Sequence, residues 1–323
     1  MVTYSLRKSS ALQWVRAVML VLALAAPAWA AGGKTFSSIV VFGDSLSDPG
    51  NDFALINTQN TPPYDNLDPG TIIPHAPYAK GGHHYSNGAT WVEQFARPRR
   101  LAQYVNPAWQ SAGTKAANYA VGGGRAYDDQ INKNLPQQVD RFLEDVGEHH
   151  APSDALYVIE FGGNDARDIL VNGDAGTIID KAANSIGNSI YLLWLNGARK
   201  FLVWNVPDLS KTPAIRAMGP DVQQAVYGLL YYFFNPALDF ALSQVSQLPG
   251  IDIYRFDAFG KVNEIVTNPE AYGLDVVDKA CVTPNIPPFD CKTPDDYLFW
   301  DGIHPTMVVH GIFAQEAASV LSQ

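Results

Sequence analysis

Five short apolar stretches alternate along the chain with longer stretches in which apolar residues recur at helical spacing. The short stretches are β-rich and end in turn residues, as buried strands do; they are Ile39–Phe42, Asn118–Val121, Ala155–Phe161, Phe201–Val206 and Ile251–Phe256. Helices are expected at Thr90–Leu101, Leu135–Val146, Ala175–Leu195 and Asp221–Val245, and again after Pro305. This alternation predicts an α/β fold with helices on both faces of a parallel sheet.

The N-terminal segment follows a different pattern. Basic residues stand near its start, an apolar run of about ten residues follows at Ala17–Ala26, and Ala28-Trp29-Ala30 is an A-x-A cleavage pattern. A membrane-spanning helix needs ~20 apolar residues, so this run is too short for one. We therefore expect residues 1–30 to be a signal peptide, and residues 31–323 to form one domain of an exported protein, periplasmic or secreted.

The charge balance narrows the range of partners. The 323 residues include 22 Lys and Arg against 32 Asp and Glu, a net charge of -10, and 47% of the residues are hydrophobic. An acidic globular chain without a Lys/Arg-rich run is a poor partner for nucleic acid. No later apolar run is long enough to span a membrane, so stable membrane insertion is not expected. The oligomeric state is not indicated.

The chain contains two cysteines, Cys281 and Cys291. In an oxidising compartment, two cysteines this close in sequence favour a structural disulfide. A zinc site would need paired histidine neighbours, which these cysteines lack.

Turn residues with chemically active side chains follow three of the expected strands and recur near the C-terminus. These segments are Gly43-Asp44-Ser45-Leu46-Ser47-Asp48, Gly122-Gly123-Gly124, Gly162-Gly163-Asn164-Asp165 and Asp301-Gly302-Ile303-His304-Pro305. Each alone is an ordinary turn composition. Ligands of open parallel sheets bind beyond the carboxyl ends of the strands, so segments in these positions are expected to meet there.

Together the segments are typical of nucleophilic catalysis. A Ser45 hydroxyl needs an imidazole to take its proton, for which His304 is the candidate, and Asp301 is the candidate carboxylate that orients the imidazole. The negative charge that develops on a substrate carbonyl oxygen needs fixed donors. The Ser45 N–H, an N–H of the glycine run and the Asn164 amide are the candidates for this oxyanion hole.

The four segments, with the residues that precede two of them and in this order along the chain, resemble conserved sequence blocks of the GDSL, or SGNH, hydrolase family. Phe42–Asp48 resembles block I, Asn118–Gly123 block II, Gly162–Asp165 block III and Asp301–Pro305 block V. The resemblance implies a five-stranded flavodoxin-like α/β/α sandwich. It assigns Ser45, Asp301 and His304 to the catalytic triad, and Ser45, Gly123 and Asn164 to the oxyanion hole.

The family resemblance also implies the activity. Members hydrolyse esters of lipids, lysophospholipids, aryl alcohols or acetylated sugars without a metal or an organic cofactor. Ser86-Asn87-Gly88 and Trp204–Leu209 resemble the lipolytic branch. The chain departs from the family pattern at two places. Pro49 replaces a common Thr beside the nucleophile, where it is expected to stiffen the loop, and His83-His84-Tyr85 replaces a common Gly-Arg-Phe, whose missing arginine bears on substrate preference.

We therefore expect an exported serine esterase or lipase that acts on lipid, lysophospholipid or short acyl esters through an acyl-enzyme intermediate. A carbohydrate acetylesterase and a catalytically silent envelope-binding module are the alternatives on the same fold. Transfer of the acyl group to an alcohol other than water also stays open, because the triad does not encode the second nucleophile.

Other patterns favour plainer interpretations. A dinucleotide-binding loop is not predicted, because Tyr127 stands where the third glycine of that motif is required. The G-x-S-x-G elbow of the α/β-hydrolase fold is absent, and so is the H-E-x-x-H helix of metalloproteases. The aromatic residues of Tyr227–Phe240 are expected in the core, and His75, His83 and His84 in loops. The Pro- and Gly-rich interval Phe53–Tyr85 is either a functional loop or an ornamental insertion.

Overall fold

Four parallel strands form the main sheet of the protein. The computed structural model describes residues 35–55, 84–110, 115–147, 149–282 and 291–323. The expected signal peptide, residues 56–83 of the Phe53–Tyr85 interval, and His75 and His83 lie outside these ranges. The strands lie in the order β1 (Ile39–Gly43), β2 (Leu156–Glu160), β3 (Lys200–Trp204) and β4 (Asp252–Phe256).

The expected fifth strand is not formed as a strand, so a count of five is wrong for the described residues. Asn118–Val121 lies parallel to β1 at the edge of the sheet, where Val41 donates to Ala117 O at 2.9 Å and accepts from Tyr119 N at 2.8 Å. On its outer side it forms only one isolated backbone bridge, with Pro107, where Ala108 N donates to Asn118 O at 2.9 Å. A side chain also binds the carbonyls of this side, because Asn51 Nδ2 donates to Asn118 O and Ala120 O at 2.8 Å each. The segment therefore pairs through isolated bridges and does not form a regular strand.

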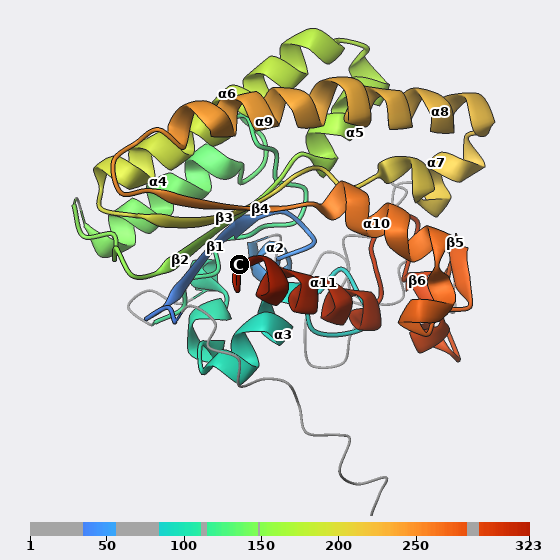
Figure 1. The fold of residues 1–323 in the computed structure, drawn as a ribbon, viewed down its shortest axis with the longest axis horizontal. Coiled ribbons are helices and arrows are strands. Elements are labelled where there is room, and N and C mark those ends of the chain that lie inside the picture. The colour runs from blue at the N-terminus through green and yellow to red at the C-terminus, as the bar shows by residue number, and fades with distance from the viewer. Residues whose placement is uncertain (1–34, 56–83, 111–114, 148, 283–290) are drawn as a thin grey trace, which may run out of the picture. The chain divides into compact units, whose positions relative to one another are not determined.

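Helices cover both faces of the sheet (Figure 1). One face packs against α4 (Leu135–Val146), α5 (Gly163–Asn172), α6 (Ala175–Leu195) and α9 (Asn235–Val245). The other packs against α3 (Trp91–Ala96), α10 (Ala258–Thr267) and α11 (Met307–Val320). The expected three-layer α/β arrangement around a parallel sheet is confirmed.

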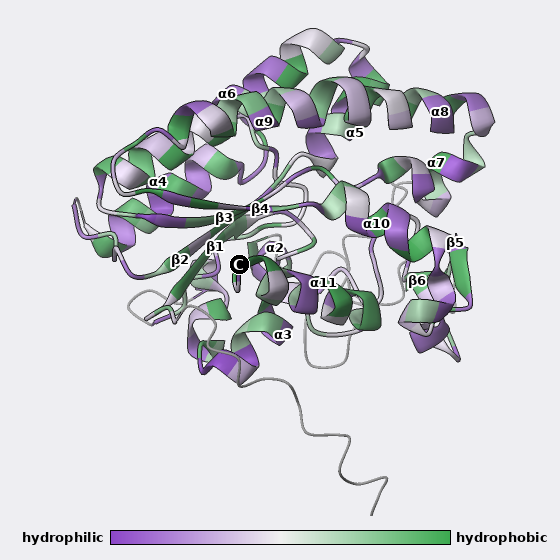
Figure 2. Cartoon of the chain, in the orientation of Figure 1, coloured by the Kyte–Doolittle hydropathy of each residue, from purple (hydrophilic) through white to green (hydrophobic). Residues whose placement is uncertain are grey.

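The strand sequences explain this burial on both sides. Successive side chains of a strand point to opposite faces, and in β1 Val40 and Phe42 join one core while Ile39 and Val41 join the other. All five residues of β1 and of β2 are buried. Figure 2 shows hydrophobic residues along β1 and β2, hydrophilic residues in β4, and both kinds of residue on the covering helices.

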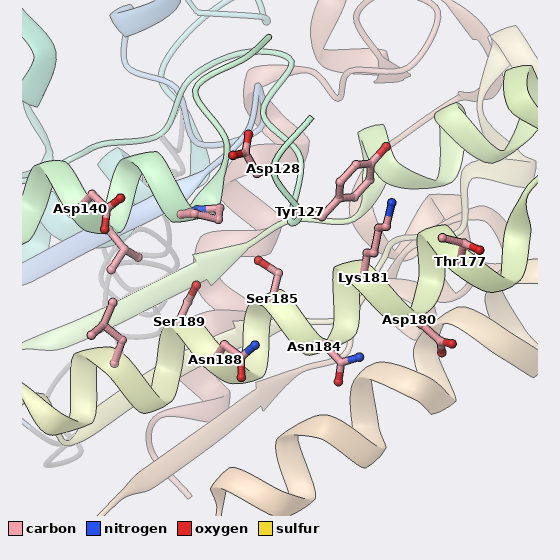
Figure 3. Close-up of a pocket in the computed structure, with 13 residues that line it drawn as sticks. Tyr127, Asp128, Asp140, Thr177, Asp180, Lys181, Asn184, Ser185, Asn188 and Ser189 are labelled. Carbon is pink, nitrogen blue, oxygen red and sulfur yellow. The ribbon is translucent and has the colours of Figure 1, made fainter. Parts of the chain in front are cut away.

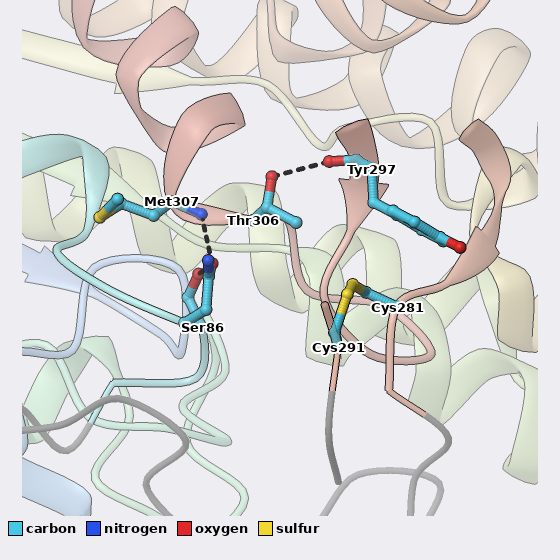
Figure 4. Close-up of a disulfide and its surroundings, with 7 residues drawn as sticks. Ser86, Cys281, Cys291, Tyr297, Thr306 and Met307 are labelled. Atoms are coloured by element: carbon cyan, nitrogen blue, oxygen red, sulfur yellow. Dashed lines mark hydrogen bonds between the residues drawn. A yellow bond between two sulfur atoms is a disulfide. The ribbon is translucent and has the colours of Figure 1, made fainter. Parts of the chain in front are cut away.

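Two short parallel strands, β5 (Val276–Ala280) and β6 (Tyr297–Phe299), form a second sheet that the sequence pattern did not predict. The expected disulfide is confirmed beside it, with the Cα atoms of Cys281 and Cys291 5.5 Å apart (Figure 4). Cys281 N and Val282 N donate to the carbonyls of Phe299 and Trp300 at 3.0 and 2.8 Å. The disulfide therefore lies next to the segment that enters Asp301.

A π-helical turn at Leu230–Phe234 joins α8 (Pro220–Leu229) to α9. Every fourth residue of this run faces the core: Val226, Leu230, Phe234, Leu238 and Leu242 are all buried. The expectation that the aromatic residues here are core residues is wrong for four of them. Tyr231, Tyr232, Phe233 and Phe240 are 50%, 64%, 62% and 69% exposed, because they lie between the core-facing positions.

The remaining helices are short. They are α2 (Asn51–Leu55), α7 (Pro213–Ala217) and the 3-10 turns Arg97–Arg99, Ala102–Val105, Ala108–Gln110, Leu209–Lys211, Pro269–Tyr272 and Pro294–Asp296. Among the helices within the described ranges, we find none that is long and apolar enough to cross a membrane.

Candidate active site

Ser45, His304 and Asp301 form a continuous chain of hydrogen-bonding contacts. His304 Nε2 lies 2.8 Å from Ser45 Oγ, and His304 Nδ1 lies 2.8 Å from Asp301 Oδ2. The three residues are buried, with Ser45 8% exposed at the surface of a pocket. A hydroxyl, an imidazole and a carboxylate in this order can pass a proton from the hydroxyl to the imidazole and stabilise the resulting imidazolium.

The spacing of Asp301 and His304 follows from the turn that they share. Asp301 Oδ1 accepts the N–H groups of Ile303 and His304 at 2.9 and 2.8 Å, and its Oδ2 is left to face the imidazole. One carboxylate thus folds the loop with one oxygen and orients the ring with the other. Trp300 N donates to His304 O at 2.7 Å and closes the same turn.

The Ser86-Asn87-Gly88 motif binds the segment that follows His304, and Figure 4 shows Ser86 below Met307 of this segment. Ser86 Oγ donates to Pro305 O at 2.8 Å, and Met307 N donates to Asn87 Oδ1 at 2.7 Å. Met307 is the first residue of α11, so Asn87 satisfies one of the N–H groups that a helix start leaves without an intrahelical acceptor. The motif therefore positions the imidazole from outside its own turn.

Tyr85 also packs on His304, and the sequence analysis did not identify it. The two ring centroids are 5.0 Å apart, and the Tyr85 hydroxyl donates to Asp52. A side chain at Gly122 is incompatible with this packing, because its Cβ would lie 2.4 Å from the Tyr85 ring. The glycine in this block is thus explained by the close approach of the ring to the backbone.

The expected oxyanion donors differ in their hydrogen bonding. Within the described ranges, neither Ser45 N nor Gly123 N donates to a protein acceptor. The neighbouring amides are occupied, because Gly122 N donates to Asp48 Oδ2 at 2.8 Å and Gly124 N donates to Val121 O at 3.0 Å. Of the three glycines, Gly123 is therefore the one whose N–H is available to a ligand.

The side-chain amide of Asn164 contacts two protein acceptors. Its Nδ2 donates to Gly124 O at 3.0 Å and, through a longer bond of 3.3 Å, to Asp44 Oδ2. Asn164 stands at the start of α5, directly after β2, while Ser45 follows β1. The adjacent carboxyl ends of β1 and β2 thus bring the serine and the amide to one pocket.

Asp44 and Glu160 are two buried carboxyl groups beneath this amide. Asp44 is 3% exposed and Glu160 is 2% exposed. Burial raises the pKa of both groups, and the charge of Asp44 raises the pKa of Glu160 further. Glu160 Oε2 accepts from Ser47 Oγ at 3.0 Å and from Asp44 N at 3.4 Å. A proton shared within such a pair keeps two buried like charges from facing each other.

The pocket beside Ser45 has a volume of about 370 Å³. Its walls combine charged groups with apolar side chains from Leu46, Leu170, Leu209, Ile215 and Met218. This composition suits an apolar chain attached to a polar reacting group.

A second hollow of about 700 Å³ lies over α4 and α6, and most of the residues that line it are polar (Figure 3). Figure 3 places Lys181 next to Tyr127, and its Nζ lies 5.9 Å from the centroid of the ring. None of the proposed triad or oxyanion residues lines it. In the part of the chain that the structure describes, no cluster of three or more His, Cys, Asp or Glu side chains could hold a metal ion.

Comparisons with known proteins identify the family of the chain. Residues 39–317 match the family described as GDSL-like Lipase/Acylhydrolase. The chain is 28% identical to the GDSL esterase/lipase At1g74460 of Arabidopsis thaliana, over 82% of this chain and 82% of that protein. It is 25% identical to phosphatidylcholine-sterol acyltransferase of Aeromonas hydrophila, over 88% and 90% of the two chains.

A solved structure of a candidate GDSL-like lipase from Parabacteroides merdae aligns with 90% of this chain and 97% of its own, with a TM-score of 0.48 and 16% identity. The family match covers most of the sequence and includes all four blocks. The chain therefore belongs to the GDSL-like lipase/acylhydrolase (SGNH hydrolase) family and is a carboxylic ester hydrolase of the GDSL esterase/lipase type.

Proposed function

We propose that this hydrolase works through an acyl-enzyme intermediate on Ser45. His304 takes the proton of the hydroxyl as Ser45 attacks the ester carbonyl, and passes it to the leaving alcohol. Water then attacks the acyl-enzyme with His304 as the base and releases the acid. The observation that supports this proposal is the unbroken contact from Ser45 Oγ through His304 to Asp301, at 2.8 Å in each step.

The proposed oxyanion hole consists of Ser45 N, Gly123 N and Asn164 Nδ2. The first two N–H groups donate to no protein acceptor within the described ranges, so they are free to bind the carbonyl oxygen. Asn164 becomes the third donor when the substrate oxygen replaces its 3.3 Å bond to Asp44. Removing one such donor typically reduces the rate about 10²- to 10³-fold.

The proposed substrates are acyl esters, of lipids or of shorter chains. The apolar wall formed by Leu170, Leu209, Ile215 and Met218 supports an acyl chain of several carbons better than an acetyl group alone. One relative is an acyltransferase, so transfer of the acyl group from Ser45 to an alcohol, in place of water, should be measured beside hydrolysis.

Labelling with a fluorophosphonate probe tests the nucleophile. The protein should be labelled, and Ser45→Ala should abolish both labelling and esterase activity. Ser153→Ala, at an exposed serine that does not line the pocket, is the control and should keep the label. A folded protein that is never labelled would favour a silent binding module. A profile of p-nitrophenyl esters by chain length, beside acetate release from xylan, then separates acyl esterase from acetylesterase activity.

We also propose that the protein is exported and that residues 31–323 act as one domain after cleavage behind Ala30. The disulfide between Cys281 and Cys291 supports this, because such bonds persist in oxidising compartments. Expression with the full N-terminus, cell fractionation and mass analysis of the product test the proposal. A protein that keeps residues 1–30 and stays in the cytoplasm would contradict it.

A further inference from the structure

Arg167 differs from the other arginine of the substrate pocket in its partners. Arg125 is paired with carboxylates: its Nε and Nη2 bind the two carboxylate oxygens of Asp168 at 2.9 Å each, and Asp129 lies 3.4 Å away. Arg167 lines the same pocket, but within the described ranges it forms an ion pair with no carboxylate. Its one hydrogen bond to the residues that the structure describes is a long contact of 3.4 Å from Nη1 to Asn164 Oδ1.

The position of Arg167 on α5 places it next to the reacting centre. It follows Asn164 by three residues, and residues three apart on a helix share a face. Burial and then the nearby charge of Arg125 lower the pKa of Arg167, and the more weakly acting charges of Asp168, Asp44 and Asp301 oppose this shift. An arginine stays protonated even so, so the pocket contains a partly desolvated positive charge beside the proposed oxyanion amide.

We propose that Arg167 is an anion subsite that binds a phosphate or carboxylate group carried by the ester substrate close to the scissile bond. A guanidinium has five N–H donors in a planar fork, and four of them have no protein partner within the described ranges. Such a fork binds the oxygens of phosphate or carboxylate in pairs. This inference rests on the proposed function, because it assigns the substrate class of the same pocket.

The apolar residues beside Arg167 indicate a second part of the substrate, an acyl chain. Leu170 and Val171 follow on the same helix, line the pocket and are 37% and 83% exposed. They offer an apolar path from the subsite to the surface. The substrate class that fits both features is an amphiphilic ester with an acyl chain and an anionic group near the ester.

A plainer role for Arg167 is to orient the Asn164 amide through the Oδ1 contact. The two roles predict different kinetics. An orienting residue affects every ester equally and acts on kcat, whereas an anion subsite affects only charged esters and acts on KM and kcat/KM.

The test uses three octanoyl esters: neutral octanoyl glycerol, octanoyl glycerol 3-phosphate and the carboxylate ester O-octanoyl glycolate. Arg167→Gln keeps a donor for Asn164 and removes the charge. We expect kcat/KM for a charged ester to fall about ten- to hundredfold, with less than a threefold change for the neutral ester. Arg167→Lys should recover part of the loss. The charged ester with the larger loss identifies phosphate or carboxylate as the ligand.

Arg216→Gln is the matched control, since Arg216 lies on α7 and does not line the pocket. It should leave the preference unchanged. If Arg167→Gln does not fold, raised salt offers a second measurement on the unmodified protein, and it should reduce turnover of the charged esters selectively. Equal losses on all three esters, or no preference for a charged ester, would overturn the subsite while leaving the esterase proposal intact. Failure to hydrolyse any ester or to react with the probe would contradict the proposed function itself.

Discussion

His304 Nε2 lies 2.8 Å from Ser45 Oγ, although 259 positions separate the two residues in the chain. Ser45 follows the first strand of the sheet, and His304 stands just before the last helix. The contact depends on the turn that Asp301 organises, since one oxygen of Asp301 binds two backbone N–H groups of that turn and the other faces the imidazole.

Asp301→Asn should therefore reduce kcat with little change in KM. The asparagine can still accept the N–H groups of the turn, but its amide would donate toward His304 Nδ1 and favour the wrong tautomer of the ring. In a related triad arrangement such a change costs about 10⁴-fold, so a loss of about 10³- to 10⁴-fold is expected. Steady-state kinetics on a p-nitrophenyl ester measure it. Asp295→Asn, an exposed acid just before β6, is the control. Equal activity in Asp301→Asn and the unmodified protein would remove Asp301 from the triad.

Much of this site could be predicted from the sequence, because each block stands directly after an apolar, strand-like segment or before a helix. The alternation of strands and helices then puts the blocks at one edge of the sheet. What the sequence pattern missed depends on contacts between distant segments. Neither the packing of Tyr85 on His304 nor the pairing of β5 with β6 has a local periodic signal. The segment at Asn118 has the composition of a strand, but Asn51 binds its outer carbonyls, a role that no local pattern reveals.

The carboxyl pair of Asp44 and Glu160 makes stability depend on pH. Both pKa values are raised in the folded protein, that of Asp44 to about 6, chiefly by burial. The folded state thus holds protons that the unfolded state releases near pH 4. The stabilisation from this pair is complete below about pH 4 and is lost as the pH rises through the raised pKa values.

Glu160→Gln should reduce this loss, because a glutamine amide can donate to Asp44 without carrying charge. The free energy of unfolding of the Glu160→Gln variant, relative to that of the unmodified protein, should increase between pH 5 and pH 8. The increase should be on the order of 1 kcal/mol per pH unit over the titration range. Urea unfolding at several pH values measures it. Glu144→Gln on the exposed side of α4 should show no such trend. Parallel pH profiles for Glu160→Gln and the unmodified protein would contradict the shared-proton interpretation.

Asn87 should matter for both stability and catalysis, since its Oδ1 accepts the first N–H of α11 just after His304. Asn87→Ala removes this cap, and comparable losses cost about 1 kcal/mol of stability. The loop that carries the imidazole would also lose one of its two attachments to the Ser86-Asn87 segment. We expect a lower melting temperature together with a lower kcat. Asn172→Ala, at the exposed end of α5, serves for comparison and should alter neither. A loss of stability without any change in kcat would show that the cap does not position His304.

The disulfide should stabilise the segment that leads into the catalytic turn. It closes a loop between residues ten positions apart, for which the chain-entropy model gives about 2–3 kcal/mol. Cys281 N and Val282 N also bind the carbonyls of Phe299 and Trp300, just before Asp301.

Replacing both cysteines by serine should lower the melting temperature and reduce activity at temperatures well below unfolding of the unmodified protein. Activity measured across a temperature series, with and without a reducing agent, tests this. The double variant should be insensitive to the reductant, whereas the unmodified protein should lose stability when it is added. If reduction leaves both stability and the temperature profile unchanged, the bond does not support the Asp301 turn.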